Sequence, residues 1–497
     1  MTMGYGLRRT AFDRSSYAYI SGQLGVASVY DYGAVGDGVH DDTQAIQRAL
    51  DDAMVLVFPS DTYLITGTLR PRSYQHLLMF GKFLVGANVT LWNFDGVLHT
   101  QVLGSLHITD PQGITDGTVP AVTFTGGCRW LLIDKIFTWN VGWSVLMTDI
   151  NESHFTAIHG QLCRGDGLYW GGDPCNVHDN VFASIFFAGT TDDIGTVGSG
   201  LHCNPGSQGN IGGNRIDRIT VLSLANGFNV DGGGWKELWI GTAIWDTCNV
   251  GWRESGGMSD ILIDQCWTNA GGYGGYWAAN QGQSANQGQS VRTIAVNQWH
   301  TNHNAQDGLR IEWTVDMSIG SFTANDNGGY GLHGAANTTV GEILIGQAHI
   351  VGNTAGDIQW DSNPSGYYPG LSIDTVVTTH TYYWQDITGS YARNSGMQVG
   401  MFNAQTPLPT TGPTAGTIYW FQSMNTYPVK TWTATFDGYK NDSTTNQTLS
   451  FPLPYAFAPT ATVNSTGLTI TADTTSVTIT TPDNTTAYNG VVQFVGI

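Results

Sequence analysis

The sequence predicts an all-β protein whose central part is a parallel β-solenoid of stacked coils. The first observation behind this prediction is composition: of 497 residues, 65 are Gly and only 12% are charged. A long helical protein would instead be rich in Ala, Glu, Lys and Leu and poor in Gly. The length exceeds that of one compact core, so either several domains or one repeat body is needed. Composition favours the repeat body.

The second observation is a repeat in which a Gly precedes a large apolar residue. Six of the eight successive spacings fall between 23 and 27 residues, and the other two are 33. A period in the mid-twenties, with alternating apolar residues after each Gly, is typical of one coil of a three-faced parallel β-helix. The repeat glycines are Gly142, Gly167, Gly200, Gly227, Gly251, Gly275, Gly308, Gly331 and Gly356.

Asn residues recur in the same register. Asn269, Asn302 and Asn325 each lie six positions before the repeat Gly of their coil. Side-chain amides stacked in this way hydrogen-bond along a solenoid axis, so we expect a structural Asn ladder.

The sequence of residues 29–53, in the N-terminal part of the chain, predicts a strand, a Gly-rich turn and a helix. The helix is expected to begin after Asp41 or Asp42, which would cap it, and to bury an apolar face. That face is Ala45, Ile46, Ala49 and Leu50. Such a helix would cover the open end of a solenoid, whose strands would otherwise invite pairing.

The net charge and the cysteine spacing indicate which binding partners and which cellular compartment to expect. The formal net charge is -20, which repels phosphate backbones, so nucleic acid is an unexpected partner. No segment is apolar enough to enter a membrane, and no signal-peptide core precedes the coils, so we expect synthesis in a cytoplasm. The six cysteines show no CxxC spacing and are expected to be reduced core thiols. No HExxH or Asp-rich calcium loop occurs, so neither a metal nor a cofactor is predicted.

The pattern DYGAVGDGVHDDTQAIQ from Asp31 to Gln47, followed by FPSDTYLI, resembles the pectate-lyase-like superfamily, and within it the tailspike depolymerases of bacteriophages. The coils extend this likeness to about Gly356. The resemblance implies a right-handed parallel β-helix, a homotrimer carried on the virion, and action on a polysaccharide at the host cell surface. The NTD, GHG and RIK motifs of polygalacturonases are missing, which argues against pectin as substrate.

Four segments are expected. Residues 1–28 are interpreted as a neck or a virion-attachment remnant that would bind the phage tail or baseplate. Residues 29–402 form the β-helix, and the Pro- and Thr-rich residues 403–417 a linker. Residues 418–497 alternate with period two between turns and predict a β-sandwich for trimerisation or sugar binding.

Alternation after the repeat Gly predicts which side chains face solvent. The first and third positions are apolar and point inward, so the second and fourth point outward. A file of aromatic rings, Arg and His suits an oligosaccharide, although a subunit interface has the same composition. The predicted substrate-binding residues are Tyr169, His202, Arg253, Trp277, Arg310 and His333, with Asn229 in the same file.

Carboxylates on this wall predict the catalytic groups. Asp231 and Glu312 are at fourth positions, and Glu254 is at a third position where the strand was expected to turn away. Glycosidases use two carboxyl groups about 5 to 9.5 Å apart, and coils stack about 4.8 Å apart. Glu254 then belongs to both feasible pairs and is the first candidate.

The predicted function is a phage tailspike that cleaves a capsular, exopolysaccharide or O-antigen chain as an endo-acting glycoside hydrolase. A lyase on the same scaffold stays open, since Tyr169, His202, Arg253 and Arg310 could supply a base and a cation. A non-catalytic receptor-binding adhesin and a secreted microbial enzyme are further alternatives. The file of wall residues is common to all of them.

Overall fold

The computed structural model describes residues 26–190, 197–206, 209–231, 235–255, 259–269, 271–277, 292–360, 370–378, 398–406, 417–424, 430–439, 446–450, 460–464, 469–473, 476–480 and 488–496. The chain divides into two compact units, which are considered separately. Unit 1 comprises residues 1–191 and 205–218, and unit 2 comprises residues 192–204 and 219–497. Most of the expected neck therefore lies outside the described residues.

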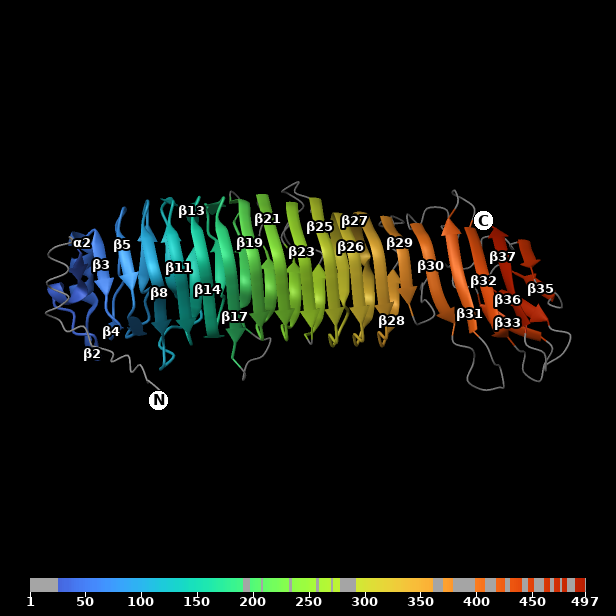
Figure 1. Cartoon of the computed structure of the whole chain (residues 1–497), viewed down its shortest axis with the longest axis horizontal. Coiled ribbons are helices and arrows are strands. Elements are labelled where there is room, and N and C mark those ends of the chain that lie inside the picture. Colours follow the sequence, from blue (N-terminus) through green and yellow to red (C-terminus); the bar gives the residue numbers. More distant parts are fainter. Residues whose placement is uncertain are drawn as a thin grey trace, which may run out of the picture. The chain divides into compact units, whose positions relative to one another are not determined.

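Unit 1 consists of short parallel strands stacked coil upon coil, drawn in blue to teal in Figure 1. Its elements are β1 (Ala27–Ser28), η1 (Val29–Tyr32), β2 (Asp37–Asp41), α2 (Thr43–Asp52), β3 (Val55–Phe58), β4 (Thr62–Ile65), β5 (His76–Met79), β6 (Lys82–Val85), β7 (Trp92–Asp95), β8 (Gln101–Thr109), β9 (Pro120–Thr125), β10 (Cys128–Arg129), β11 (Leu132–Trp139), β12 (Trp143–Met147), β13 (Asp149–Asn151), β14 (His154–Cys163), β15 (Leu168–Gly171), β16 (Asn176–His178) and β17 (Val181–Gly189). Strand β19 (Asn210–Leu222) begins in unit 1 and ends in unit 2.

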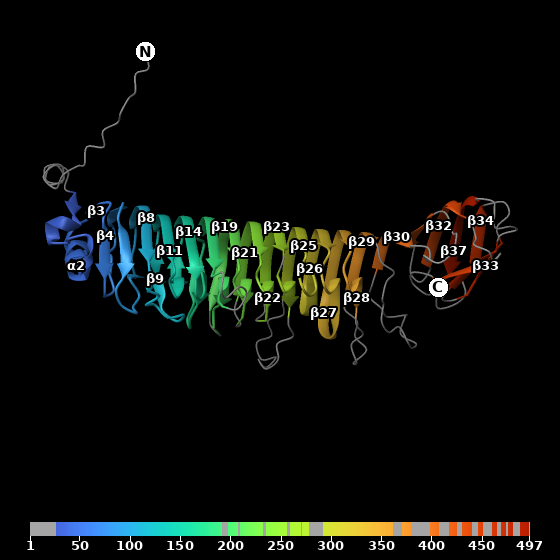
Figure 2. The same cartoon turned by 90° about the horizontal axis from the view of Figure 1, so that it is seen from below.

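Helix α2 is present where the sequence predicted it, and it buries the four predicted apolar residues. It lies at the N-terminal end of the coils of unit 1 (Figure 2). Asp42 is the N-cap residue but makes no side-chain capping bond. Its carboxylate accepts the N–H groups of Val35 and Gly36, while Asp41 accepts the N–H of Thr43 at 3.0 Å. The helix is confirmed, and its role as a cap stays a prediction.

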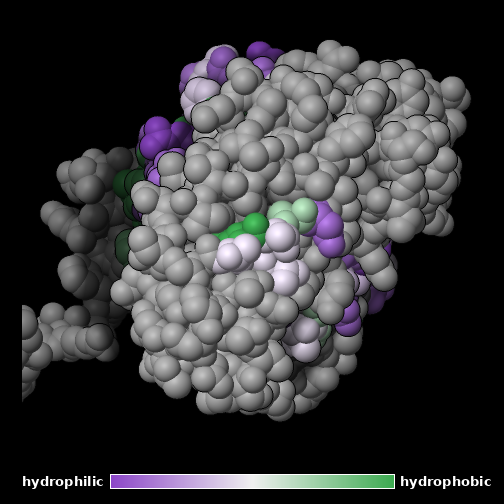
Figure 3. Space-filling view, turned by 90° about the vertical axis from the view of Figure 1, so that its right-hand side faces the viewer, coloured by the Kyte–Doolittle hydropathy of each residue, from purple (hydrophilic) through white to green (hydrophobic). Residues whose placement is uncertain are grey.

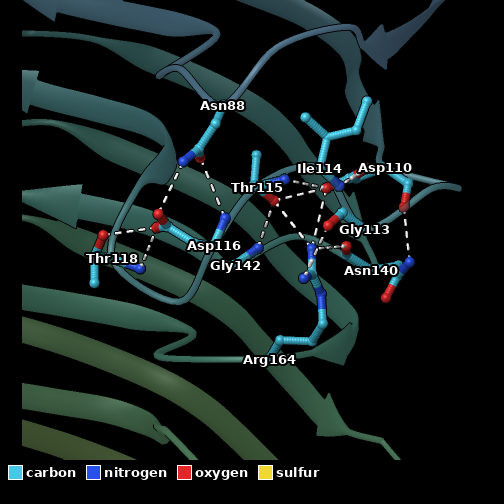
Figure 4. A network of polar contacts seen from close by, with 10 residues as sticks. All are labelled: Asn88, Asp110, Gly113, Ile114, Thr115, Asp116, Thr118, Asn140, Gly142 and Arg164. Atoms are coloured by element: carbon cyan, nitrogen blue, oxygen red, sulfur yellow. Dashed lines mark hydrogen bonds and ion pairs between the residues drawn. The ribbon is translucent and has the colours of Figure 1, made fainter.

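A polar network fixes the connection between β8 and β9 in unit 1 (Figure 4). The buried Asp110 carboxylate accepts the N–H and hydroxyl of Thr115 and pairs with Arg164 at 3.0 Å. The Thr115 hydroxyl in turn accepts the N–H of Gly142 at 2.8 Å. Because a buried carboxylate needs such partners, this connection is held in one conformation against the coils.

Unit 2 has the same architecture, with short strands of about five residues alternating with longer ones, drawn in green to orange in Figure 1. Its coil elements are β18 (Ser199–Asn204), β20 (Asn226–Val230), β21 (Trp235–Asp246), β22 (Val250–Glu254), β23 (Ser259–Asn269), β24 (Tyr273–Trp277), β25 (Arg292–Asn302), β26 (Leu309–Asn325), β27 (Tyr330–Val351), β28 (Gly356–Trp360), β29 (Gly370–Thr378) and β30 (Gln398–Thr406). All of these strands pair in parallel, which confirms the parallel β-helix.

The interior of unit 2 is a column of aromatic rings. Trp252 stacks on Trp299 with ring centroids 5.6 Å apart, and Trp299 packs edge to face on Phe322. Each large ring removes much apolar surface from water, and this is the main driving force for stacking coils. All six cysteines are buried free thiols, as the sequence predicted.

The Asn ladder exists, but it is displaced from the predicted positions. Asn269, Asn302 and Asn325 do pair in register from coil to coil. The amides that hydrogen-bond in series are instead the buried Asn304, Asn327 and Asn353, with Nδ2 to Oδ1 distances of 2.8 Å. The residue before each of them has a positive φ, which turns the next side chain inward.

Past the coils, two antiparallel sheets replace the parallel pairing. One contains β31 (Thr417–Met424), β32 (Lys430–Tyr439), β37 (Tyr488–Gly496) and β34 (Thr460–Asn464); the other contains β33 (Asn446–Ser450), β36 (Ser476–Thr480) and β35 (Thr469–Ala472). On the face in Figure 3 the coloured residues form small groups of mixed hydropathy.

The expected linker is partly ordered into strands. Its first residues belong to β30, which pairs with both β29 and β31, and its last residue begins β31. The predicted domain boundaries and the sandwich therefore stay predictions. No helix among the described residues is long and apolar enough to span a membrane.

Candidate functional site

The short strands of unit 2 carry one continuous file of outward side chains. Strand pairing places His202 beside Asn229, Asn229 beside Arg253, and Arg310 beside His333. Neighbouring members are one coil apart, about 4.8 Å. The structure leaves His202, Arg253 and Arg310 in contact with solvent, whereas Asn229 and His333 are buried at 5% and 8% exposed, so the prediction that these two face solvent is wrong. Tyr169 belongs to unit 1, where its ring packs on Trp143.

The prediction that Trp277 faces outward is wrong. Trp277 is 0% exposed and pairs with the inward residues Glu254 and Ile311. The sequence offers two adjacent glycines here, and Gly274, rather than Gly275, occupies the repeat position. Gly275 is itself an inward position, where an added Cβ would lie 2.9 Å from the Trp299 ring. The outward position passes to Tyr276, which pairs with Arg253 and Arg310.

The prediction that Glu254 belongs to the wall is also wrong. Glu254 is 2% exposed and pairs with the inward Val230 and Trp277. It occupies a third position, and alternation places third positions inward, so the strand does not turn away as expected. A polysaccharide on the wall cannot reach this carboxylate without opening the coil.

Asp231 forms the first carboxylate site on the wall. Its Oδ1 lies 2.8 Å from His202 Nε2, and Asn229 Nδ2 donates to its Oδ2 at 3.3 Å. Burial raises the pKa of Asp231, but His202, Asn229 and the charge of Arg253 together lower it below the usual value. The carboxylate is 39% exposed and ionised at neutral pH.

Glu312 forms the second and denser site. Arg310 Nε donates to its Oε1 at 2.8 Å, and the Tyr276 hydroxyl donates to its Oε2 at 3.3 Å. Burial and the nearby Glu312 raise the pKa of Tyr276, so its hydroxyl keeps its proton. Burial disfavours the charge of Arg310, but Glu312 and Asp307 raise its pKa. Glu312 is 17% exposed.

Asp307, which the wall pattern did not select, completes this site. Its Oδ2 lies 2.7 Å from His333 Nδ1 and 3.6 Å from Arg310 Nη1, and its Oδ1 accepts the N–H of Tyr330. Asp307 and Glu312 contact nitrogens of one planar guanidinium, so their carboxylate oxygens lie within roughly 9 Å of each other. The sequence signal for Asp307 was its position directly before the repeat Gly308, in a turn.

Aromatic rings surround the Glu312 site. Tyr273 and Tyr276 stack with centroids 5.0 Å apart, and the Arg310 guanidinium lies 6.0 Å from the Tyr276 ring. A site with paired carboxylates, a cation and ring faces can bind sugar rings and exchange protons with a glycosidic oxygen. Within the described residues, no three His, Cys, Asp or Glu side chains are arranged to hold a metal ion.

Comparison with known proteins gives a family signature and a fold. Residues 26–88 match the model of the rhamnogalacturonase A/epimerase, pectate lyase-like family. The fold is similar to that of the tailspike protein of E. coli bacteriophage HK620, with a TM-score of 0.53, 10% sequence identity and coverage of 99% of this chain and 97% of that one. At this identity the likeness concerns the fold alone.

A curated relative matches a short part of the chain. The plasmin and fibronectin-binding protein A of Streptococcus pneumoniae is 33% identical over 106 residues, which are 20% of this chain. The matched segment spans only 14% of the relative's own length.

Proposed function

We propose, from the premise that this chain is a parallel β-helix protein of the pectate-lyase-like superfamily, that it is a phage tailspike which binds and hydrolyses a bacterial surface polysaccharide. The observation that carries the proposal is the Glu312 site. There, one half-buried carboxylate receives hydrogen bonds from Arg310 and Tyr276 and lies near a second carboxylate, Asp307.

In this proposal Glu312 is the catalytic base. A carboxylate within reach of an attacking water can take a proton from it. Asp307 and His333, whose facing atoms are 2.7 Å apart, are 4% and 8% exposed, so in this proposal they hold Arg310 in place and the leaving oxygen takes its proton from water. Arg253 and Tyr276 bind the sugar, and Asp231 with His202 forms a flanking contact.

The contacts of Arg310 remove one of the two candidate cations for a lyase reaction, and the other, Arg253, is exposed. A lyase needs a cation that neutralises the uronate of its substrate. Arg310 already contacts both Glu312 and Asp307, so its charge is compensated within the protein. The lyase and the adhesin remain the two alternatives that the test must separate.

The test is incubation of the purified protein with surface polysaccharides from candidate hosts, followed by product analysis. New reducing ends without unsaturation support hydrolysis. Unsaturated uronates in the products would replace the proposal with a lyase. Binding without shortening would leave only the adhesin.

The oligomeric state and the cellular location of the protein are tested separately from its activity. The chain is proposed to assemble as a homotrimer attached to the phage tail through residues 1–28, to be made in the host cytoplasm and to act at the host surface. Sedimentation equilibrium of the full chain measures the stoichiometry, and a monomeric mass would contradict the trimer.

A further inference from the structure

The long-strand sheet of unit 1 carries a second outward file that the candidate site does not use. Strand pairing on β6, β8, β11, β14 and β17 aligns the file from one coil to the next. The adjoining file contains Ser105, Lys135, Ala157 and Ser184. We call the following residues the lysine–histidine face: Lys82, Lys135, His107, His159, Phe137 and Phe186.

The face is positive although the molecule is strongly negative. The chain has 39 acidic residues against 19 basic ones, yet neither file contains a carboxylate. Asp134, next to Lys135 in the chain, accepts the backbone N–H of Gly104 at 3.0 Å. Burial lowers the pKa of His107 and His159, and the charge of Lys135, joined at His107 by that of Lys82, lowers it further. The histidines are therefore neutral at pH 7, and Lys82 and Lys135 set the sign of the face.

Aromatic surface lies beside these cations. The Lys135 ammonium is 5.4 Å from the centroid of the Phe137 ring. His107 packs on Phe137 edge to face, with centroids 4.7 Å apart and planes at 83°. Edge-to-face packing leaves ring surface uncovered, in contrast to the Tyr74, His99 and Trp130 rings, which are stacked face on face. The face thus combines half-buried ammonium groups with available ring surface.

We propose that the lysine–histidine face is a second glycan-binding surface, and that it takes a sugar bearing a carboxylate, such as a uronate. The lysines attract the carboxylate, the imidazole and serine groups offer hydrogen bonds to hydroxyls, and the rings pack on the sugar C–H groups. The net charge of -20 repels an acidic polysaccharide over most of the chain. The positive charge of the lysine–histidine face offsets this repulsion locally. The inference rests on the proposed polysaccharide function and specifies the charge of the ligand.

The experiment measures binding of an oligogalacturonate to the full-length protein by calorimetry, with maltohexaose as the neutral probe of equal length. Lys135→Met and Lys82→Met keep the aliphatic stem and remove the charge. Arg70→Met is the matched control, because it removes one exposed positive charge from another part of unit 1. We expect about tenfold weaker oligogalacturonate binding for each lysine variant, no change for the control, and a marked loss at high salt.

A second readout locates the ligand. Nuclear magnetic resonance of selectively labelled histidines should show the pKa of His107 and His159 rising when the oligogalacturonate binds, because an anion favours the imidazolium.

Three outcomes would each overturn the proposal. They are an equal loss of binding in the Arg70→Met control, histidine signals that do not move when the oligogalacturonate is added, and binding of maltohexaose with equal affinity. If the lysine variants had a lower oligomer mass but bound oligogalacturonate as wild type does, the face would be a subunit contact and the proposal would fail. Because Glu312→Gln is expected to keep oligogalacturonate binding, failure of the hydrolase proposal is distinguishable from failure here.

Discussion

The two carboxylate sites of the unit 2 wall each have two side-chain hydrogen-bond partners, but they differ in exposure and in the chemical type of those partners. Asp231 is 39% exposed and has one histidine and one amide as neighbours, whereas Glu312 is 17% exposed and is held by an arginine and a tyrosine. Electrostatic interactions strengthen as water is excluded, so the less exposed carboxylate, which is bonded to an arginine, is better preorganised for chemistry. The denser site is therefore the one to which catalysis is assigned, and the sparser one is assigned to binding.

Removing each carboxylate charge should separate the sites most clearly. Glu312→Gln is expected to lower the rate of polysaccharide cleavage by about 10²- to 10⁴-fold, because it removes the base, while Asp231→Asn should lower it by about tenfold or less. The measurement is the appearance of reducing ends at saturating polysaccharide.

Two further glutamates provide the controls. Glu237→Gln changes an exposed carboxylate on β21 and should leave the rate unaltered. Glu254→Gln should also keep the rate, since that side chain is inside the coil. A larger loss in Asp231→Asn than in Glu312→Gln would reverse the assignment, and abolished cleavage in a folded Glu254→Gln would restore the sequence-based choice.

Asp307→Asn tests whether the dense site depends on its buried member. The substitution removes the carboxylate that Arg310 and His333 share, and breaking a largely buried ion pair costs about 3 kcal/mol of the free energy of unfolding. Denaturant unfolding monitored by tryptophan fluorescence measures this loss. Asp326→Asn breaks an exposed pair with His303 and should cost less than about 0.5 kcal/mol. Equal losses in the two variants would contradict the special role of Asp307.

The sparse site should give the smallest effect, seen as a pH dependence. The folded-state pKa of Asp231 is depressed, so its contribution to stability is present above the unfolded pKa, about 3.9, and is lost as pH falls through the folded value. The difference in free energy of unfolding between wild type and Asp231→Asn should shrink as pH falls below about pH 4. His202→Asn should reduce the same difference. If the difference in free energy of unfolding between wild type and Asp231→Asn grew as the pH fell, the depressed pKa of Asp231 would be contradicted.

The repeat period predicted most of the fold, because coil stacking follows from local alternation. It placed Arg253 and Arg310 in one file, since both follow a single Gly. It failed at Gly274 and Gly275, where two glycines permit two registers and the surrounding side chains, Trp299 among them, leave no room for a Cβ at either. A ring from the next coil is invisible to a local pattern.

The dense site was only half predictable for a related reason. Glu312 lies on the alternating strand, but Asp307 is in the turn before it, where period-two alternation assigns no direction. Its role depends on His333 and on the backbone of Tyr330, both in the following coil. Hydrogen bonds between coils are tertiary contacts, and no regular residue spacing in the sequence predicts them.

The ladder of Asn304, Asn327 and Asn353 has a consequence for how such chains change length in evolution. Asn327 accepts from Asn304 and donates to Asn353, so its coil presents the same kind of junction to the coil before it and to the coil after it. Gain or loss of one whole coil leaves a continuous ladder, whereas loss of a few residues breaks two junctions at once. Related chains are therefore expected to differ in length by whole coils, and the spacing between the wall sites would change in the same discrete steps.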